Sequence, residues 1–297
     1  MLLLEILKAI VFGIVEGITE WLPVSSTGHL ILLDEFLSLN VAPELGVAFR
    51  EEFGSMFEVV IQLGAIMAVV VLFWGKLNPF VNHSGSVGRK NSLSLWGKII
   101  VASIPAALVG VVGDKILEEL SGKDIDGWIF NWQVVSIALI VYGIAFIVIE
   151  KICESREAKV QTINDLSYKN AFFVGCFQAL SIVPGTSRSG STILGSRCMG
   201  ISREAAAEFS FMLGVPAMLG ASAIKGLGFI SFVLENDISV PAIAWMVLAV
   251  ASVVAFAVSM VVIKFLMDFV KKHSFVPFGI YRIALGLIVI IYFALKV

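Results

Sequence analysis

The sequence predicts an all-α polytopic membrane protein. Three observations lead to this prediction: the composition, the long apolar stretches, and two polar interruptions within apolar sequence. Of the 297 residues, 58% are hydrophobic and only 15% are charged, whereas a soluble domain carries about 25% charged residues. The formal net charge of −2 argues against a nucleic-acid partner. We therefore expect a single integral membrane domain over residues 1–297, surrounded by the lipid bilayer.

Six stretches are long and apolar enough to cross a bilayer as helices, which takes about 20 residues each. The second of them is short for a span and could begin a few residues earlier. The predicted spans cover residues 55–75, 97–113, 132–150, 204–224, 241–264 and 277–296.

Two further regions, residues 2–39 and 168–200, are apolar at both ends but are interrupted at Pro23 and Pro184. Proline removes a backbone donor and disfavours helix at the preceding residue. Each region is therefore predicted to form helix, loop and helix, with arms too short to cross the bilayer easily. Because non-helical backbone at membrane depth must be buried in protein or line a wet cavity, we expect two re-entrant helix hairpins.

The two halves of the chain resemble each other. P-V-S-S-T from Pro23 aligns with P-G-T-S-R from Pro184, an offset of 161 residues (184 − 23). Further along, the segment around Glu58 aligns with the segment around Glu208 at an offset of 150 (208 − 58), and we assign these two acids a shared structural role. Each half then holds one hairpin and three spans. The predicted units are repeat 1, a basic cytoplasmic linker and repeat 2, at about residues 1–150, 151–170 and 171–297.

Three crossings per half is an odd number, so the second half must enter the membrane from the opposite face. The repeats are therefore predicted to be inverted. Lys and Arg favour cytoplasmic loops, and here they gather in the 76–98, 151–170 and 264–272 segments. The intervening 114–126 loop is mostly acidic. We therefore expect both termini and the mouth of the first hairpin to face the outside of the cell.

The first hairpin carries residues suited to acid–base chemistry. Glu16 and Glu20 are four residues apart and share one helix face, where two buried carboxylates repel each other unless a proton, a cation or an arginine relieves them. Ser25 and Ser26 follow the proline where a helix should begin, and Ser is a favoured N-cap. His29 lies in the first turn of that helix, where the dipole favours a neutral imidazole. Ser26 and His29 are therefore a candidate nucleophile and base.

The second hairpin supplies the opposite charge. Arg188 offers a guanidinium, and the glycines and hydroxyls around it let backbone N–H groups approach a ligand, as a phosphate-binding helix N-terminus requires. A divalent ion, Mg²⁺ or Ca²⁺, held by Glu16 and Glu20 could bridge carboxylates to phosphate oxygens. This combination fits phosphoryl chemistry. Substrate binding is assigned to Ser25, Thr27, Gly185, Thr186, Ser187, Ser189 and Gly190.

Two alternatives stay open at this point. A metal-activated water, with His29 as acid or base, is the alternative nucleophile. A secondary transporter or flippase for an anionic solute or lipid phosphate has the same predicted architecture, since such proteins are built from inverted repeats with broken helices. Two other side chains have structural assignments: Trp21 in an aromatic belt at the membrane surface, and Arg282 as a membrane anchor or ion-pair partner.

Both motifs resemble the signatures of the undecaprenyl-diphosphatase (bacitracin-resistance) family. They read E-G-I-T-E-W-L-P-V-S-S-T-G-H at residues 16–29 and P-G-T-S-R-S-G-S-T at residues 184–192, and the resemblance extends over the whole chain. It implies hydrolysis of undecaprenyl diphosphate to undecaprenyl phosphate with a divalent metal, which recycles the lipid carrier for peptidoglycan synthesis and confers bacitracin resistance.

The resemblance also implies a multi-pass protein of the bacterial cytoplasmic membrane whose partner is a polyprenyl diphosphate lipid. A homo-oligomer is considered as well. With the first hairpin opening outward, the active site is expected on the extracytoplasmic side. The residues that carry over by motif as functional, without deciding which group is the nucleophile, are Glu16, Glu20, Ser26, His29 and Arg188.

Overall fold

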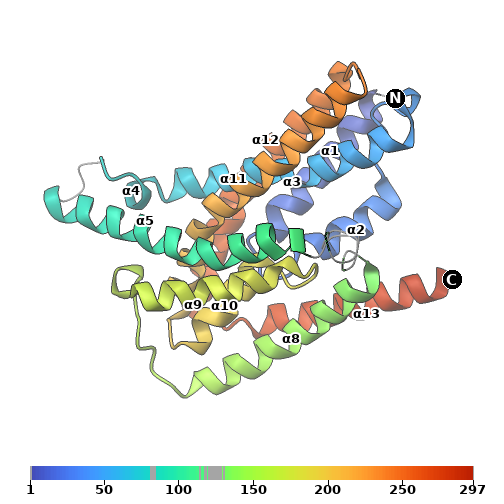
Figure 1. Cartoon of the computed structure of the whole chain (residues 1–297). Helices are drawn as coiled ribbons and strands as arrows, with labels where there is room; N and C mark the ends of the chain where they lie inside the picture. Colours follow the sequence, from blue (N-terminus) through green and yellow to red (C-terminus); the bar gives the residue numbers. More distant parts are fainter. Residues whose placement is uncertain are drawn as a thin grey trace.

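The computed structural model describes residues 2–80, 85–113, 115–116, 119, 129 and 131–296. In this part of the chain the regular secondary structure is helical and no β-strand is formed, which confirms the all-α prediction. Six helical segments of the described chain are long and apolar enough to cross a membrane, as predicted. They are α3 (Gly46–Leu72), α5 (Gly85–Leu108), α8 (Trp132–Glu154), α11 (Arg203–Glu235), α12 (Ala242–Lys272) and α13 (Val276–Lys296) (Figure 1).

Short helical turns extend two of these spans. Pro43–Leu45 precedes α3, and a π-helical turn at Val109–Gly113 follows α5. A further short helix, α4 (Trp74–Leu77), follows α3. Most of the acidic 114–126 loop, on which the orientation argument drew, lies outside the described residues.

Several spans are longer than the apolar stretches predicted. The first span begins at Pro43, 12 residues before the predicted start at residue 55 (55 − 43). At its far end, α11 continues to Glu235, 11 residues past the predicted end at residue 224 (235 − 224). The apolar pattern missed the extra turns because they carry polar side chains, such as Arg50 and Glu51, which line a cavity.

Both predicted hairpins form as helix, loop and helix. The first consists of α1 (Leu2–Thr19) and α2 (Ser26–Leu37). The second consists of α9 (Tyr168–Ala179), a 3₁₀ turn at Leu180–Ile182 and α10 (Arg188–Cys198). The helices are interrupted around Pro23 and Pro184, as the proline argument predicts.

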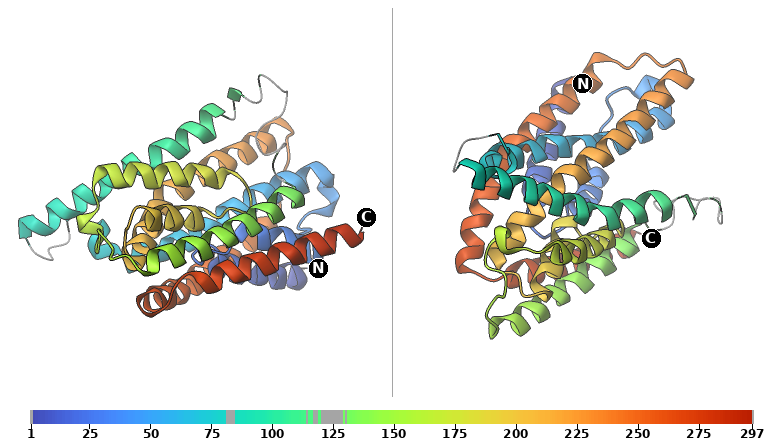
Figure 2. Two further views of the ribbon diagram at one scale, coloured as in Figure 1. Left: turned by 90° about the horizontal axis from the view of Figure 1, so that it is seen from below. Right: turned by 60° about the vertical axis from the view of Figure 1, so that its left-hand side comes forward.

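The helices pack in pairs across the two halves of the chain. In both Figure 1 and Figure 2, α8 lies alongside α13. The other main pairs are α3 with α12, α3 with α11, α1 with α12, and α9 with α5. Suppose that α1 is the counterpart of α9 in the other half, and α12 the counterpart of α5. Replacing each helix by its counterpart then turns the α1–α12 pair into the α9–α5 pair, as inverted repeats require. The inverted relation itself stays a prediction.

Glycines allow two of these helix pairs to approach closely. A Cβ atom at Gly64 of α3 would lie 2.0 Å from the carbonyl oxygen of Ser252 in α12. In the same way, a Cβ atom at Gly175 of α9 would lie 2.2 Å from the carbonyl oxygen of Ala102 in α5. Small residues at helix contacts are typical of packing in membranes.

The matched acids of the two halves each have a lysine in their surroundings at a corresponding sequence position. Glu208 of α11 forms an ion pair with Lys76 of α4, while Glu58 of α3 and Lys225 of α11 line one cavity. The two acids are 150 residues apart (208 − 58) and the two lysines 149 (225 − 76), so each half supplies an acid and a lysine. This arrangement supports the shared structural role assigned to the acids.

Helix α10 lies at the centre of the protein, with every residue from Ser189 to Arg197 buried. Its far end is fixed by Arg197, whose Nε donates to Glu150 Oε1 of α8 at 2.7 Å and whose Nη1 donates to the carbonyl oxygen of Ile201 at 2.7 Å. Arg203 at the start of α11 donates to the other oxygen of the same carboxylate, also at 2.7 Å. These contacts hold the far end of α10 between α8 and α11.

Candidate active site

The loops of the two hairpins are in direct contact. Ser189 of α10 donates its hydroxyl to the carbonyl oxygen of Glu20 at 3.0 Å, although the two residues are 169 positions apart in the sequence. The two motifs, far apart in the sequence, therefore meet in the structure.

Each loop ends in a serine cap of the same unusual geometry. Ser25 has a φ of 74° and accepts a hydrogen bond from the backbone N–H of Gly28 at 3.3 Å. Ser187 has a φ of 68° and accepts from the N–H of Gly190 at 3.1 Å. A left-handed conformation costs an L-residue roughly 1–2 kcal/mol, and such strain tends to occur at functional sites.

The two caps correct the alignment of the repeats by one residue. The sequence matched Pro23 to Pro184 and therefore Ser26 to Ser187, with an offset of 161. In the structure the equivalent caps are Ser25 and Ser187, with an offset of 162 (187 − 25). The second loop thus holds one more residue between its proline and its cap, and Ser26 occupies the position of Arg188.

Glu20 is the point at which the charged groups converge. Its Oε2 accepts a hydrogen bond from the Ser26 hydroxyl at 2.9 Å, and its Oε1 accepts from Arg188 Nη2 at 3.2 Å. Both charged side chains are nearly buried, with 8% of Glu20 and 11% of Arg188 exposed. The guanidinium also donates through Nη1 to the carbonyl oxygen of Ser210 at 2.8 Å, so it is fixed from two sides.

Glu16 is fully buried, and neither of its carboxylate oxygens has a hydrogen-bond partner within the described residues. The backbone N–H of Glu20 donates to the carbonyl oxygen of Glu16 at 3.0 Å, so the helical geometry continues to Glu20 and places both carboxylates on one face. A buried carboxylate without a partner requires a proton or a cation.

These two carboxylates fit a divalent cation only in part. Among the residues that the structure describes, no group of three or more His, Cys, Asp or Glu side chains could hold a metal ion. Mg²⁺ is often held by one or two carboxylates, with waters and substrate phosphates completing its shell. Glu16 and Glu20 therefore suit an ion that a phosphate ligand helps to bind.

No hydrogen bond joins the His29 and Ser26 side chains within the described residues, so the predicted nucleophile and base pair is not formed in the structure. Its Nδ1 is 2.7 Å from the carbonyl oxygen of Ser25, and its Nε2 is 2.7 Å from the hydroxyl of Tyr281 in α13. Because a carbonyl can only accept, Nδ1 carries the proton, and a neutral imidazole then accepts from the tyrosine at Nε2. The imidazole also stacks on the Tyr281 ring, with centroids 5.6 Å apart. The Ser26 hydroxyl points to Glu20 instead.

The residues assigned to substrate binding largely shape the loops themselves. Ser25 and Ser187 are the caps. Thr186 Oγ1 donates to the carbonyl oxygen of Val183 at 2.8 Å, and Gly185 has a φ of 92°, which favours glycine. Thr27 is half-buried in the first turn of α2.

Trp21 is not part of an aromatic belt, since it is fully buried. Its ring packs edge-on against Phe211 at 5.3 Å, and the guanidinium of Arg188 lies 5.9 Å from the ring centroid. The prediction from the sequence was wrong because tryptophan is common at membrane surfaces, whereas this ring is buried in the protein beside Arg188.

The unpaired buried polar side-chain atoms of the described residues lie on the two hairpins and on Arg282, which hydrogen-bonds to both loops. They are both carboxylate oxygens of Glu16, Trp21 Nε1, Gln178 Oε1, Arg188 Nε, Ser191 Oγ and Arg282 Nε. Native folds leave few such atoms, so a cluster of them indicates a place where a ligand, an ion or water binds.

The sequence interpretation gave no role in the site to Gln178, Tyr281 and Arg282. Gln178 lies within the polar second hairpin, so its position could have indicated a role. An arginine inside an apolar span, such as Arg282, is costly and usually functional, and this signal was available. Nothing in the sequence around Tyr281 indicates its contact with His29.

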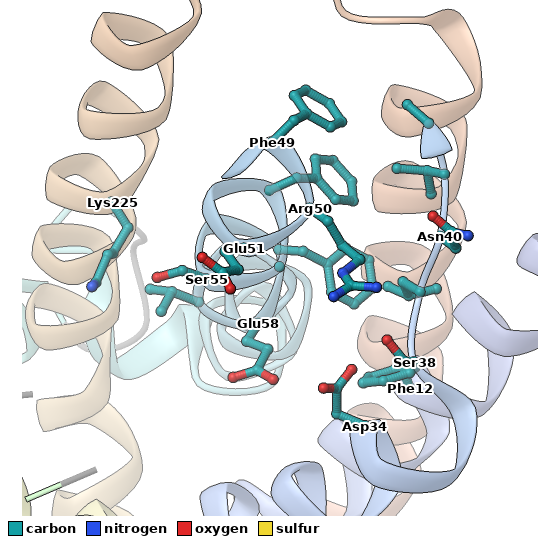
Figure 3. A pocket seen from close by; sticks show the side chains of 17 residues that line it. Phe12, Asp34, Ser38, Asn40, Phe49, Arg50, Glu51, Ser55, Glu58 and Lys225 are labelled. Atoms are coloured by element: carbon teal, nitrogen blue, oxygen red, sulfur yellow. The ribbon is translucent and has the colours of Figure 1, made fainter. Parts of the chain in front are cut away.

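A cavity of about 670 Å³ lies beside the first hairpin. In Figure 3 the carboxylates of Asp34 and Glu58 face each other, with Arg50 above them and Lys225 extending from the neighbouring α11. The 38–42 segment that follows α2 forms one wall. Glu20, Ser26 and Arg188 do not line this cavity, so it is distinct from the centre that these three residues form.

Taken with six spans, this geometry defines a polytopic membrane protein with a buried carboxylate–serine–arginine centre built from two broken helices. Residues 9–288 match the family model for bacitracin resistance protein BacA. The chain belongs to this family.

Curated relatives agree over nearly the full length. Undecaprenyl-diphosphatase 1 of Clostridioides difficile (strain 630) is 50% identical over 297 residues, covering 99% of this chain and 98% of the relative. Undecaprenyl-diphosphatase of Enterococcus faecalis is 50% identical over 290 residues, covering 97% of each chain. That of Streptococcus mutans serotype c is 48% identical over 299 residues, covering 100% of this chain and 99% of the relative.

Proposed function

We propose that this protein hydrolyses undecaprenyl diphosphate to undecaprenyl phosphate and inorganic phosphate in the bacterial membrane. The activity recycles the lipid carrier for peptidoglycan synthesis and confers bacitracin resistance. The single observation that carries the proposal is the contact of Ser26 and Arg188, from two distant motifs, with one buried carboxylate, Glu20. Relatives that share about half of its residues over their full length are named for this activity.

Arg188 is the proposed phosphate-binding group. Its Nε is buried and unpaired, so it can donate to a phosphate oxygen while Nη1 keeps its bond to the carbonyl oxygen of Ser210. A bound diphosphate competes with Glu20 for the guanidinium, since a doubly charged phosphate attracts it more strongly than a carboxylate does. When the guanidinium turns from Glu20 to the phosphate, the carboxylate loses its positive neighbour and becomes a stronger base.

Ser26 is the proposed nucleophile, and Glu20 rather than His29 is its base. The hydroxyl proton passes over 2.9 Å to Glu20 as Ser26 Oγ bonds to the terminal phosphorus. The bond from that phosphorus to the bridging oxygen breaks, and undecaprenyl phosphate leaves. Water then attacks the phosphoserine, the bond from phosphorus to Ser26 Oγ breaks, and Glu20 returns its proton to Ser26 Oγ. Both protons of the water stay on the phosphate, which is released as dihydrogen phosphate. Direct attack by water is the alternative.

Glu16 and Glu20 are the proposed ligands of a divalent ion, Mg²⁺ or Ca²⁺. The unpaired oxygens of Glu16 support this role. When bound, such an ion would neutralise phosphate charge and reduce repulsion between the diphosphate and the two carboxylates.

The test is phosphate release from undecaprenyl diphosphate by the purified protein, with Mg²⁺, with Ca²⁺ and with a chelator. We expect release with at least one of the ions and its loss with the chelator. Release that the chelator does not reduce would contradict the metal role. No release under any condition would contradict hydrolysis and favour transport of the lipid phosphate.

The site is proposed to open to the extracytoplasmic side, with both termini outside and the repeats inverted. The positive charge of the three predicted cytoplasmic segments supports this orientation. A cysteine placed at Glu44, which precedes α3 on the cavity side, should react with an impermeant reagent on intact cells. Labelling only after lysis would overturn the orientation.

A further inference from the structure

We propose that Arg282 of α13 is a positioning residue that fixes the two hairpin loops against each other for the hydrolysis proposed above. This inference rests on that function only for its effect on turnover. The contact of one side chain with both loops is a feature of the structure alone.

Three backbone carbonyls from two distant loops converge on the Arg282 guanidinium. Its Nη1 donates to the carbonyl oxygen of Pro23 at 3.1 Å. Its Nη2 donates to the carbonyl oxygens of Gly185 at 2.6 Å and Thr186 at 2.8 Å. Pro23 lies between Glu20 and Ser26, and Thr186 lies two residues before Arg188. Arg282 therefore joins the two segments that carry the catalytic candidates.

No carboxylate pairs with Arg282 in the described part of the chain, although its side chain is fully buried. Two aromatic rings of α8 also lie near it, with the ring centroids of Tyr142 and Phe146 at 5.4 Å and 6.0 Å from the guanidinium carbon. A buried charge without a counter-ion is strongly unfavourable unless its donors are satisfied. The carbonyls of the two loops accept from both Nη atoms, while Nε has no partner within the described residues. The loops and the arginine therefore stabilise one another through the two Nη groups.

The geometry leaves little freedom at this junction. A Cβ atom at Gly190, in the first turn of α10, would lie 2.8 Å from Arg282 Nη1, so glycine allows the guanidinium to approach. The C=O and N–H of a peptide point in opposite directions. Because the Gly185 and Thr186 carbonyls point toward the arginine, their partial negative charges are directed away from a phosphate bound on the other side of the loop.

The first experiment measures amide hydrogen exchange by mass spectrometry on full-length Arg282→Lys protein in detergent. Lysine keeps the charge but has no planar fork to reach both loops at once. We expect exchange in both loops, residues 20–27 and 183–190, to become about tenfold faster, with the spans unchanged. Unchanged exchange, or a change in one loop only, would overturn the proposal without involving activity.

The second experiment measures kcat and KM for undecaprenyl diphosphate, per mole of folded protein. In Arg282→Lys we expect kcat to fall about 10- to 100-fold with KM within about threefold, because misplacement of reacting groups by about 1 Å costs on the order of a hundredfold. A merely structural role would lower the yield of folded protein and leave kcat within about twofold, and that result would overturn the proposal.

Arg197→Lys is the matched control, since it is also a buried arginine that donates to a carbonyl but lies at the far end of α10. Its loop exchange and kcat should stay within about twofold of wild type. If Arg282→Lys does not fold, Gly190→Ala is used instead, because its added Cβ atom displaces Arg282 Nη1 while keeping the arginine. Loop exchange and kcat are then measured on that variant, with the same expected and contradicting results. An inactive wild-type protein would refute the proposed function, whereas loop exchange would still decide the role of Arg282.

Discussion

Replacing Glu20 by glutamine should abolish most of the turnover while leaving the shape of the site intact. Glutamine has one acceptor oxygen where the carboxylate has two, and the carboxylate uses both, at 2.9 Å from Ser26 and 3.2 Å from Arg188. If the amide oxygen accepts from the arginine, the amide nitrogen faces the serine hydroxyl and cannot remove its proton. Loss of a positioned base costs typically 10²–10⁴-fold, so we expect kcat to fall by about that factor.

Phosphate release from undecaprenyl diphosphate at saturating substrate measures this effect. Removing one partner of a buried ion pair costs about 3–5 kcal/mol of stability, so kcat must be counted per folded molecule, with folding checked by thermal unfolding. Glu208→Gln is the matched control, because Glu208 is also a buried acid paired with a cation. The reasoning is refuted if Glu20→Gln keeps more than about a tenth of wild-type kcat, or if Glu208→Gln loses as much.

Three further predictions concern the nucleophile, the histidine and helix packing. Ser26→Ala should reduce phosphate release at least about a hundredfold; substantial release would favour water as the nucleophile. Tyr281→Phe removes the donor to His29 Nε2 and should lower kcat by about three- to tenfold with the thermal midpoint unchanged; an unaltered kcat would assign His29 no part in turnover. Gly64→Ala forces a Cβ atom to 2.0 Å from a backbone oxygen of α12 and should destabilise the protein by about 1–3 kcal/mol. Gly54→Ala, in the same helix with nothing within 4 Å, should be neutral or slightly stabilising in thermal unfolding; equal effects of the two substitutions would contradict the packing.

The spans and the two hairpins could be predicted because their causes are local. Apolar runs specify spans, and Pro23 and Pro184 together with polar residues specify the breaks between short helices. The ends of the spans were less predictable, since α3 continues through polar turns around Arg50. Helix formation there does not depend on hydrophobicity.

The composition of the site could be predicted from the motifs, but its hydrogen bonds could not. The i, i+3 spacing of Ser26 and His29 favoured a pair within one turn of helix. The structure turns Ser26 back toward Glu20, because a residue at the first helical position lies beside the end of α1. His29 turns outward to Tyr281, 252 residues away. A contact between residues so far apart in the sequence cannot be predicted from a local sequence pattern.

The alignment of the two loops differs by one residue between sequence and structure. An alignment on the prolines put Ser26 opposite Ser187, whereas the left-handed caps match Ser25 to Ser187. The one-residue difference matters chemically, because it places the Ser26 hydroxyl and the Arg188 guanidinium at equivalent positions of the two hairpins. Both then face Glu20.

The central claim is that neither hairpin is sufficient and that both contribute to one hydrolytic centre. Phosphate release from undecaprenyl diphosphate by purified wild-type, Ser26→Ala and Arg188→Lys proteins tests it most directly. We predict one phosphate released per lipid by the wild type, and a loss of at least about a hundredfold in each variant. Release by either variant at close to the wild-type rate would show that its hairpin is dispensable and would contradict the account.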